Sequence, residues 1–441
     1  MTRAREPDAE GFVERASVIH PGLAPDLVYL DYNATTPVDP RVVEAMLPYL
    51  TTHFGNPSSA HAYAAAPRRA LDAARTLVAE LIGAVPAELV FTGSGSEADA
   101  LAIRGAVLAA RTSHGQAHVI TQATEHPAVL AACRALHREH GTHVTVLPVD
   151  RDGLVDPADL EAAFTPSTVL VSVMLANNET GTIQPVAELA ALSRRHGALF
   201  HTDAAQAVGK IPVDVETLGI DLLTLVGHKT YAPKGIAALY IRSGIKLAPL
   251  VDGGGQERGL RAGTESVAGA VALGAAAELA RKELADGAPG RLQKLRDELH
   301  DTLAGRLPDR VRLNGHPIRR LPNTLNLSIA GTRGHELLAQ CTSVAASTGS
   351  ACHAGNHEPS PVLSAMDVPE DSSLAAIRLS LGRWTTNADV ELAAAALAAA
   401  ATLDGSARVD RQAASAQVAE STGDVTTFAA SAAPTKLAHQ R

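Results

Sequence analysis

The sequence predicts an α/β protein in which a mainly parallel central sheet is covered by helices, followed by a smaller α+β domain. From residue 88 to residue 241, short runs rich in Val, Ile and Leu alternate with stretches of helical periodicity, which is typical of parallel strands joined by helices. After Thr264 the pattern changes to two long helices and then to short strands. We therefore expect a flexible segment over 1–26, a large domain over 27–265 whose opening residues lie near the small domain, a small α+β domain over 266–404, and a disordered tail over 405–441.

The expected elements follow from the apolar runs in chain order. Strands are expected over 88–90, 119–120, 144–147, 169–174, 199–201, 222–226 and 237–241, with a long helix from about residue 98. Helices over 266–286 and 291–306 and strands over 324–328 and 377–381 follow. Because ligands of parallel sheets bind beyond the carboxyl ends of the strands, the polar residues that follow these strands are expected to lie together: Ser96, His126, Asn178, Asp203 and Lys229.

Composition narrows the class of protein. The chain has 441 residues, a formal charge of −9 and no dense basic run, which argues against nucleic acid as a partner. Its N-terminus lacks an apolar signal core, and its most apolar stretches, 267–279 and 392–403, are too short to span a bilayer. Three cysteines give no disulfide framework. We expect a cytoplasmic protein that binds neither membrane nor nucleic acid.

Lys229 and Asp203 are the strongest chemical signal. Lys229 follows the apolar run 220–226, so its amine would be delivered at a strand end, where it can lose its proton and form a Schiff base with an aldehyde cofactor. Asp203 follows a second such run, and a carboxylate there can keep a pyridine nitrogen protonated. A lysine after a strand is most often only a solvated loop charge, so the accompanying motifs decide.

A turn of small residues, Phe91–Asp99, follows a short strand and opens the long helix. Gly95 lets backbone N–H groups approach a phosphate, the helix N-terminus adds partial positive charge, and Ser96 can donate a hydroxyl. The alternative is a serine N-cap with a glycine turn.

Together these segments resemble the fold-type I pyridoxal phosphate enzymes, in particular the class V aminotransferase group that contains the cysteine desulfurases. The resemblance runs from about Val28 to Leu403. Its landmarks are Val28–Pro37, Gly55–His61, Thr124–Val129, Asn177–Gly181, Gly253–Thr264 and Ser350–Cys352.

The resemblance implies pyridoxal 5'-phosphate as cofactor and a role for each matching residue. His126 would stack on the cofactor ring, Asn178 would lie beside the ring, and Gln206 would reach its phenolic oxygen. Further contacts to the cofactor would come from His228 and from Thr264, which crosses to the phosphate of the partner subunit in a homodimer. Asn33 and Arg378 would bind the substrate, with Arg378 clamping its carboxylate. From the residues alone, His126 could instead cap a helix, Gln206 could be an ordinary polar residue and Arg378 an exposed strand charge.

Cys352 lies in a stretch of small and polar residues that cannot bury a side chain, so its thiol is expected to be exposed. The resemblance makes it the nucleophile, although an incidental surface cysteine is the plain alternative. A zinc site formed by Cys352, His353 and His357 is disfavoured because no second ligand cluster lies nearby, and we predict no metal. Cys133 and Cys341 lie on apolar helices and are expected to be buried.

The implied function is a cysteine desulfurase, which removes sulfur from L-cysteine to give L-alanine and a persulfide on Cys352 for a sulfur-acceptor protein. Val226 departs from the family pattern, because many desulfurases have there a serine that donates to the phosphate. The segment Val-Gly-His-Lys over 226–229, together with Ala-Cys-His over 351–353 and Glu-Pro-Ser-Pro-Val-Leu over 358–363, also resembles selenocysteine lyases, so L-selenocysteine is the alternative substrate. A non-catalytic scaffold should have lost Lys229, Asp203 or Cys352, and an ordinary aminotransferase would have no use for the cysteine loop.

Overall fold

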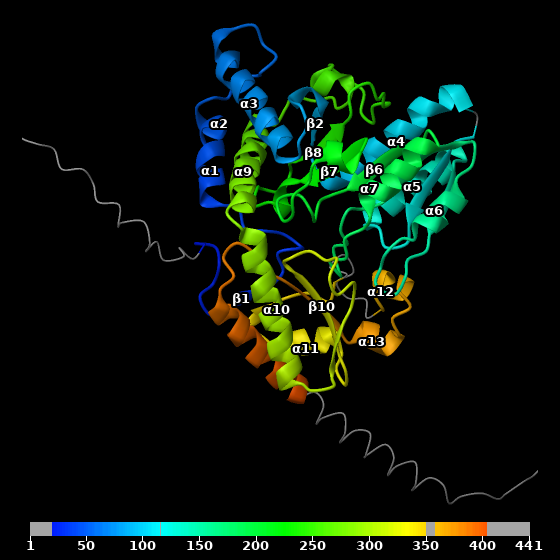
Figure 1. Cartoon of the computed structure of the whole chain (residues 1–441). Helices are drawn as coiled ribbons and strands as arrows, with labels where there is room; N and C mark the ends of the chain where they lie inside the picture. The colour runs from blue at the N-terminus through cyan, green and yellow to red at the C-terminus, as the bar shows by residue number, and fades with distance from the viewer. Residues whose placement is uncertain (1–19, 115, 350–357, 404–441) are drawn as a thin grey trace, which may run out of the picture.

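The structure is a computed structural model that describes residues 20–114, 116–349 and 358–403. A seven-stranded sheet with its helices forms the upper part of the molecule in Figure 1, and a three-stranded sheet with its helices forms the lower part. The described chain enters in the lower part and returns there after the large sheet is complete.

The large sheet has the order β2-β8-β7-β6-β5-β3-β4. Its strands are β2 (Leu89–Thr92), β3 (His118–Gln122), β4 (His143–Leu147), β5 (Thr168–Ser172), β6 (Leu199–Asp203), β7 (Leu222–Val226) and β8 (Ala237–Ile241). Strands β3 to β7 pair in parallel, and β8 runs antiparallel to both of its neighbours, β7 and β2. The predicted mainly parallel sheet is confirmed, and each predicted strand in this region is present.

Alternate residues of these strands face two different apolar cores. Val90, Leu170 and Leu222 pack with helices α4 (Gly95–His114) and α5 (Pro127–His140), whereas their neighbours Val171 and Leu223 pack on the opposite face. The opposite face is covered by α3 (Ala65–Leu81), α6 (Pro157–Ala163), α7 (Val186–Arg195) and α9 (Val267–Ala285). Because successive strand residues point to opposite faces, a strand covered by helices on both sides reads as a continuous apolar run.

Short helices complete the upper part of the molecule. They are α1 (Pro40–Met46), α2 (Pro48–Thr51), α8 (Val215–Leu218), η1 (Ala62–Ala64), η2 (Pro86–Glu88), η3 (Gly227–Lys229) and η4 (Gln256–Gly259). Several helices begin after an aspartate whose carboxylate accepts a backbone N–H of the first turn, as Asp39 does for α1, Asp156 for α6 and Asp214 for α8.

The lower part is built on the antiparallel sheet β12-β10-β9, formed by Ala376–Ser380, Thr324–Ile329 and Val311–Leu313. It is covered by α10 (Ala288–Arg306), by a helix over 387–403 and by the short helices α11 (Gly334–Gln340), α12 (Pro361–Ala365) and α13 (Glu370–Leu374). The opening strand β1 (Val28–Tyr29) pairs in parallel with β11 (Val344–Ala345), so the start of the described chain packs here. The predicted domain limits at 26/27, 265/266 and 404/405 stay a prediction.

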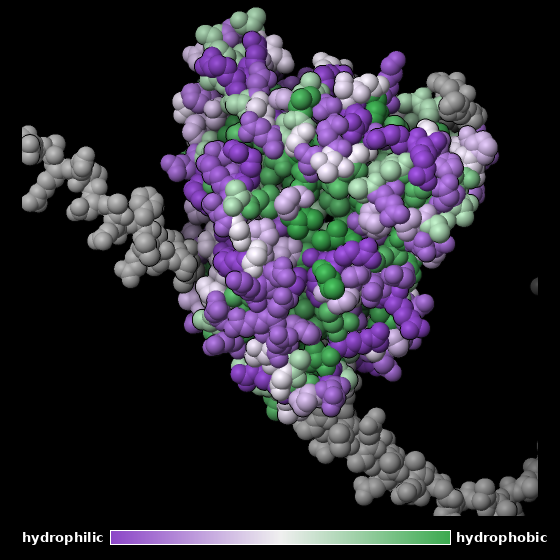
Figure 2. Space-filling model, in the orientation of Figure 1, coloured by the Kyte–Doolittle hydropathy of each residue, from purple (hydrophilic) through white to green (hydrophobic). Residues whose placement is uncertain are grey.

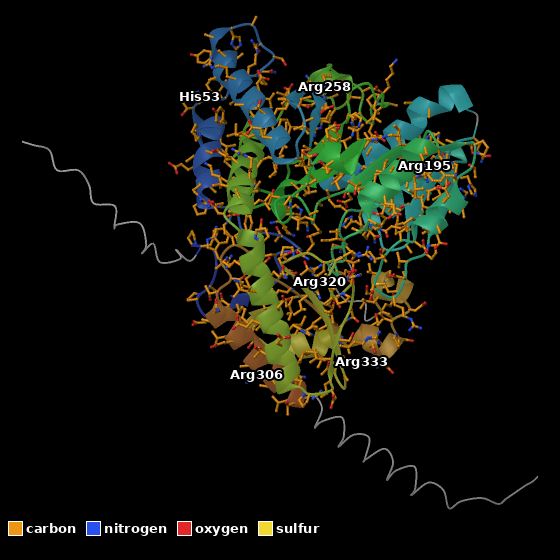
Figure 3. All side chains as sticks on the ribbon, in the orientation of Figure 1. His53, Arg195, Arg258, Arg306, Arg320 and Arg333 are labelled. Atoms are coloured by element: carbon orange, nitrogen blue, oxygen red, sulfur yellow. The ribbon has the colours of Figure 1, made fainter. Side chains whose placement is uncertain are left out.

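The two parts are joined by polar contacts as well as by the chain. Thr182 and Arg320 form an isolated β-bridge, and the label of Arg320 lies near the middle of the molecule in Figure 3. Arg383, from the lower part, ion-pairs with Asp39 and Glu283 and lies over the Tyr231 ring at 3.9 Å from its centroid. Three separate segments of the upper part are therefore held by one guanidinium group.

The surface in Figure 2 is largely polar, with apolar residues gathered over the middle of the face shown. Within the residues that the structure describes, no helix combines the length and the apolar character needed to cross a bilayer.

Gly274 offers a test of how closely α3 and α9 pack. A Cβ added at Gly274 would lie 2.8 Å from Cα of Ala74 on α3, whereas nothing lies within 4 Å of a Cβ added at Gly290 on α10. Gly274→Ala should lower the denaturant midpoint, because forcing the helices apart costs about 1–3 kcal/mol and outweighs a gain in helix propensity of about 1 kcal/mol. The matched change Gly290→Ala should not lower it, and equal midpoints for the two variants would contradict this packing.

Candidate active site

A cavity of about 590 Å³ lies at the carboxyl ends of the parallel strands, between the large sheet and the lower part of the molecule. It brings together most of the side chains that the sequence singled out. The predicted site residues that line it are Asn33, Gly95, Ser96, His126, Asn178, Asp203, Gln206, His228, Lys229 and Arg378. The expectation that strand ends converge on one cavity therefore holds for residues from five different strand ends.

The N-terminus of α4 forms one end of the cavity. Ser94 caps the helix, because its Oγ accepts the N–H of Glu97 at 3.2 Å, and both Ser94 and Ser96 line the cavity. A Cβ at Gly95 would lie 2.6 Å from Cγ2 of Val226 at the end of β7, so only glycine allows this close approach. The result is a turn of accessible backbone N–H groups at a helix N-terminus, which suits a phosphate.

Asp203 lies at the end of β6 with its carboxylate buried against the cavity. Its Oδ1 accepts the N–H of Ala205 at 2.9 Å. Burial raises the pKa of Asp203, and the nearby charges of His126 and Lys229 oppose that rise. A protonated ring nitrogen placed against this carboxylate would compensate its desolvation.

A layer of buried polar groups lies behind Asp203. His201 contacts Ser172 Oγ at 2.9 Å and Thr224 Oγ1 at 3.2 Å, and its Nε2 lies 3.7 Å from Asp99 Oδ1. Burial lowers the pKa of His201 to about 3 and raises the pKa of Asp99 well above its usual range. The contact between His201 and Asp99 therefore joins two neutral groups and is not an ion pair.

Two further buried acids escaped the sequence analysis. Burial raises the pKa of Glu125 well above its usual range, and its Oε1 accepts the N–H of Met174 at 2.6 Å. Asp99, His126 and Asp203 each place a possible ligand atom within 4.8 Å of the others, so Asp99 lies directly beside the two residues predicted to hold the cofactor ring. In the sequence, Glu125 and Asp99 are marked only by their nearness to predicted site residues: Glu125 precedes His126, and Asp99 lies one helical turn after Ser96.

His126 combines both roles that the sequence left open. It is the N-cap of α5, where its Nδ1 accepts the N–H of Ala128 at 3.2 Å, and its ring also lines the cavity. Burial lowers the pKa of His126, and because Nδ1 is an acceptor, the neutral ring carries its proton on Nε2. A neutral ring fixed by a cap is suited to stacking on a flat cofactor.

The amine of Lys229 points to the loop after β1. Its Nζ donates to the carbonyl oxygens of Asn33 at 2.6 Å and of Ala34 at 2.7 Å. The neighbouring His228 contacts Thr35 Oγ1 at 3.2 Å, and burial and the charge of Lys229 lower the pKa of His228 to about 4. The loop that carries Asn33 therefore holds the short helix η3 that carries the lysine.

Arg378 lies on β12 opposite the large sheet, and it is buried, not an exposed strand charge. Its Nη2 forms an ion pair with Asp31 at 2.7 Å, and its Nη1 donates to the carbonyl oxygens of Asn178 and Gly349. Its buried Nε has no hydrogen-bond partner among the described residues. The sequence analysis did not identify Asp31 as a partner of Arg378, because the two residues are 347 positions apart in the chain.

Gln206 and Asn178 both line the cavity, and each is held there by a hydrogen bond to Asn33, Gln206 through its side chain and Asn178 through its backbone carbonyl. The Gln206 amide nitrogen donates to the carbonyl of Asn33 at 3.0 Å, while the carbonyl of Asn178 accepts from Asn33 Nδ2 and from Arg378. Both residues are thus tied to the loop after β1.

The cavity lining does not include Thr264, and the structure does not describe Cys352. Thr264 is exposed and lies outside the cavity lining. Cys352, together with His353 and His357, lies outside the described residues. The chain on either side of it meets at Glu179, because Ser360 Oγ donates to Glu179 Oε2 at 2.6 Å and a Cβ at Gly349 would lie 2.8 Å from the same oxygen.

The other two cysteines are buried, as predicted. Burial raises the pKa of Cys133 to about 12 and also raises the pKa of Cys341, so neither is a ready nucleophile.

The residues present fit pyridoxal phosphate. The helix N-terminus at Gly95 suits its phosphate, the buried carboxylate of Asp203 suits its ring nitrogen, and the strand-end amine of Lys229 suits its aldehyde. Fold and site together define the class of fold-type I pyridoxal phosphate enzymes.

The chain belongs to the aminotransferase class-V family, which matches residues 28–392. Members of this family depend on pyridoxal phosphate. A relative named cysteine desulfurase, from Trichormus azollae, is 48% identical over 367 residues, covering 83% of this chain and 90% of the relative. A relative named cysteine desulfurase IscS, from Anaeromyxobacter dehalogenans, is 47% identical over 369 residues, covering 83% of this chain and 90% of the relative.

Solved structures agree with this assignment. A NifS-like protein has a TM-score of 0.79 at 35% identity and covers 86% of this chain and 100% of its own. A structure described as SspA in complex with cysteine has a TM-score of 0.71 at 35% identity, covering 80% of this chain and 98% of its own. The resemblance inferred from the sequence motifs is confirmed.

Val226 allows the phosphate end of the cavity to be tested. Val226→Ser places a hydroxyl beside Gly95, where the valine methyl groups now lie. We expect dissociation of pyridoxal phosphate to slow by about tenfold or more, since one hydrogen bond to a charged group adds about 1.5–3 kcal/mol. Val226→Ala is the matched control, because it removes the methyl groups without adding a donor. Equal dissociation rates for the Ser and Ala variants would contradict a phosphate at this position.

Proposed function

We propose that this protein is a pyridoxal phosphate-dependent cysteine desulfurase, which converts L-cysteine to L-alanine and keeps the sulfur as a persulfide on Cys352. The observation that carries the proposal is one cavity that combines Lys229 and Asp203 with both ends of the segment that contains Cys352. Relatives at 47–48% identity named cysteine desulfurase support it.

The cofactor, when bound, supplies an electron sink for the negative charge that develops on the substrate α-carbon. Lys229 removes the α-proton and later returns a proton, because its amine lies at the cavity in reach of two carbonyl acceptors that orient it. With the cofactor bound, the carboxylate of Asp203 would keep the ring nitrogen protonated, and the neutral ring of His126 would pack against the cofactor ring.

Arg378 and Asn33 bind the substrate. Arg378 lines the cavity as a positive charge that would attract the substrate carboxylate, while its Nη2 keeps the ion pair with Asp31 and so fixes the plane of the guanidinium group. Asn33 keeps its side chain between Thr324 and Asn178, so it forms the floor of the site.

Cys352 acts as the sulfur acceptor. Its thiolate attacks the substrate sulfur, the new S–S bond forms as the C–S bond breaks, and the electron pair of the broken bond remains with the organic product. After uptake of a proton that product is L-alanine. The persulfide then passes its outer sulfur to an acceptor protein, which is the predicted partner, in a predicted cytoplasmic setting.

L-selenocysteine is the second candidate substrate, and the observation that favours it is Val226 at the phosphate end of the cavity. A selenium leaving group is cleaved more easily and requires less help from Cys352. Incubating the purified protein with L-cysteine and with L-selenocysteine, and measuring L-alanine, tests the proposed function directly.

Cys352→Ser separates the thiol from the rest of the site. This variant should bind pyridoxal phosphate normally, because Lys229, Asp203 and His126 are unchanged, but L-alanine formation from L-cysteine should fall by about 100-fold or more, as expected for loss of a nucleophile. Mass spectrometry of the wild type after one turnover should find one added sulfur on the peptide that contains Cys352.

Cys341→Ala is the control for this experiment, since Cys341 is a buried thiol that lies away from the cavity. It should retain activity. A Cys352→Ser variant with full activity on L-cysteine would exclude the mechanism, and turnover of L-selenocysteine alone would move the assignment to a lyase.

We also propose a homodimer in which Thr264 completes the phosphate site of the other subunit. The support is that Thr264 is exposed and lies outside the cavity of its own chain, although the family motif assigns it to the phosphate.

A mixed dimer tests this sharing. In a dimer of one Lys229→Ala chain and one Thr264→Ala chain, a shared arrangement leaves one site with both residues intact. We expect that site to show wild-type turnover, whereas dimers of either variant alone are impaired. A mixed dimer no more active than half a Thr264→Ala dimer, or a fully active monomer by light scattering, would contradict sharing.

A further inference from the structure

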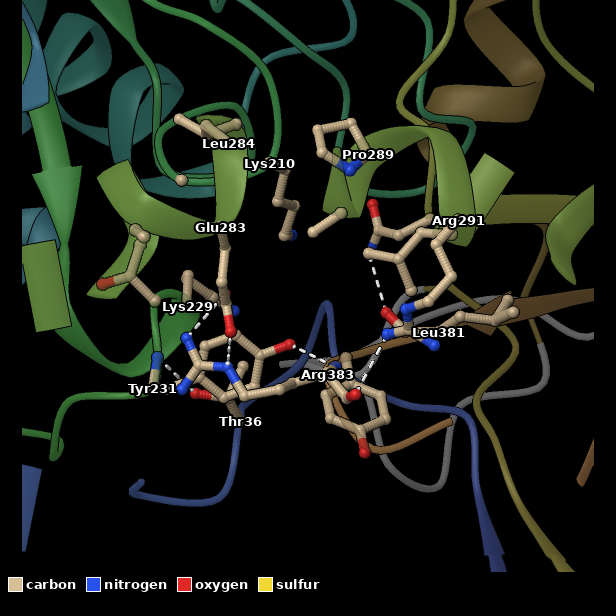
Figure 4. Close-up of a pocket in the computed structure, with 17 residues that line it drawn as sticks. Thr36, Lys210, Lys229, Tyr231, Glu283, Leu284, Pro289, Arg291, Leu381 and Arg383 are labelled. Atoms are coloured by element: carbon tan, nitrogen blue, oxygen red, sulfur yellow. Dashed lines mark hydrogen bonds and ion pairs between the residues drawn. The ribbon is translucent and has the colours of Figure 1, made fainter. Parts of the chain in front are cut away.

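A second cavity of about 180 Å³ lies behind the proposed active site and shares Lys229 with it. Figure 4 shows Lys210 pointing toward the middle of this cavity from above, with Lys229, Tyr231 and Arg383 along its lower side. Lys210 therefore lies in the wall between the two cavities, and neither the sequence motifs nor the proposed mechanism gives it a role.

Lys210 binds two side-chain amides of the active site. Its Nζ donates to Gln206 Oε1 at 2.7 Å and to Asn33 Oδ1 at 3.1 Å. The nitrogen atoms of the same amides donate elsewhere: Gln206 Nε2 to the carbonyl of Asn33, and Asn33 Nδ2 to Asn178 and Thr324. Because a carbonyl can only accept, these contacts require that both amide oxygens face Lys210.

The backbone carbonyl of Asn33 connects Lys210 to the catalytic amine. That oxygen accepts Lys229 Nζ at 2.6 Å and Gln206 Nε2 at 3.0 Å. Lys210 binds the side chain of Asn33, which carries this carbonyl, and the side chain of Gln206, which donates to it. A change in either amide would therefore move the acceptor that orients Lys229.

Lys210 is not there to neutralise an acid. Among the described residues it takes part in no ion pair, and the one acidic residue that lines the second cavity, Glu283, pairs with Arg383. Burial and the charges of Lys229 and Arg378 lower the pKa of Lys210 well below its usual range. A buried amine without a carboxylate partner is costly, so we attribute its presence to the hydrogen bonds that it donates to Gln206 and Asn33.

We propose that Lys210 is a positioning residue for Lys229: by fixing the amides of Asn33 and Gln206, it sets the direction from which the Lys229 amine meets the cofactor aldehyde and the substrate. This inference rests on the proposed cofactor site and adds a residue that acts on that site only through others.

The test follows capture of pyridoxal phosphate by the cofactor-stripped full-length protein, read as the rise of visible absorbance, with the attachment residue identified by borohydride reduction and peptide mapping. Lys210→Met should slow capture on Lys229 by about tenfold, the effect expected when a hydrogen bond from a charged or buried amine is lost. Lys210→Arg should stay within about threefold of the wild type, because its guanidinium group also donates and the 180 Å³ cavity leaves room for it.

Two further variants make the result specific. Lys234→Met removes an exposed lysine whose charge is also felt at the site through His228, and it should capture at the wild-type rate. Lys210→Gln is uncharged, and its amide nitrogen stands one bond closer to the backbone than the lysine amine. It should therefore hold the two amide oxygens less well and be slowed, and it serves if Lys210→Met does not fold by circular dichroism. For substrate turnover, kcat should fall in the Met and Gln variants while KM for L-cysteine changes little.

Wild-type capture by both Lys210→Met and Lys210→Gln would overturn the proposal. Equal slowing of Lys210→Arg and Lys210→Met would also overturn it, because packing and not donation would then be what matters. Capture is followed without L-cysteine, so a wild type that captures the cofactor but forms no L-alanine contradicts the proposed function and leaves these outcomes intact.

Discussion

The arrangement of the site depends on Asn33, a residue that bonds to both parts of the molecule within the active site. Its N–H donates to Ser380 on β12 at 2.9 Å, while its side chain bonds both to Thr324 on β10 and to the loop of Asn178. Its carbonyl receives the amine of Lys229. Every polar group of one loop residue is thus satisfied by partners from distant segments, and a buried network of this kind fixes one geometry when all its members are paired.

Much of the fold could be predicted because it is encoded locally. In the run 222–226 every residue but Thr224 is apolar, and in β7 Leu222 packs into the core on one face while Leu223 packs into the core on the other, as a strand covered on both faces requires. The convergence of His126, Asp203 and Lys229 followed from the same logic, since parallel strands place their carboxyl ends on one edge. Such inferences need only neighbouring residues and a topology rule.

The rest of the site could not be predicted because it depends on contacts between remote segments. No local pattern marks Asp31 as the partner of Arg378, 347 positions away, or Lys210 as the partner of Asn33, 177 positions away. Ser94 and Ser96 both line the cavity from one turn, and only the backbone geometry shows that Ser94 is the helix cap. The spacing of residues along the chain identifies candidate functional groups. The folded structure determines which of them line the site and which hold those groups in position.

The clamp formed by Arg383 has a consequence for selectivity. One largely buried guanidinium group ties Asp39, Glu283 and the Tyr231 ring together, and Tyr231 follows Lys229 by two residues. The segment that carries Lys229 to the active-site cavity is therefore already held in place before any ligand arrives. A preformed site spends little binding free energy on reorganisation, so affinity reflects fit directly. Discrimination between a sulfur and a selenium amino acid of nearly the same shape would then have to come from bond chemistry, not from the recognition of shape.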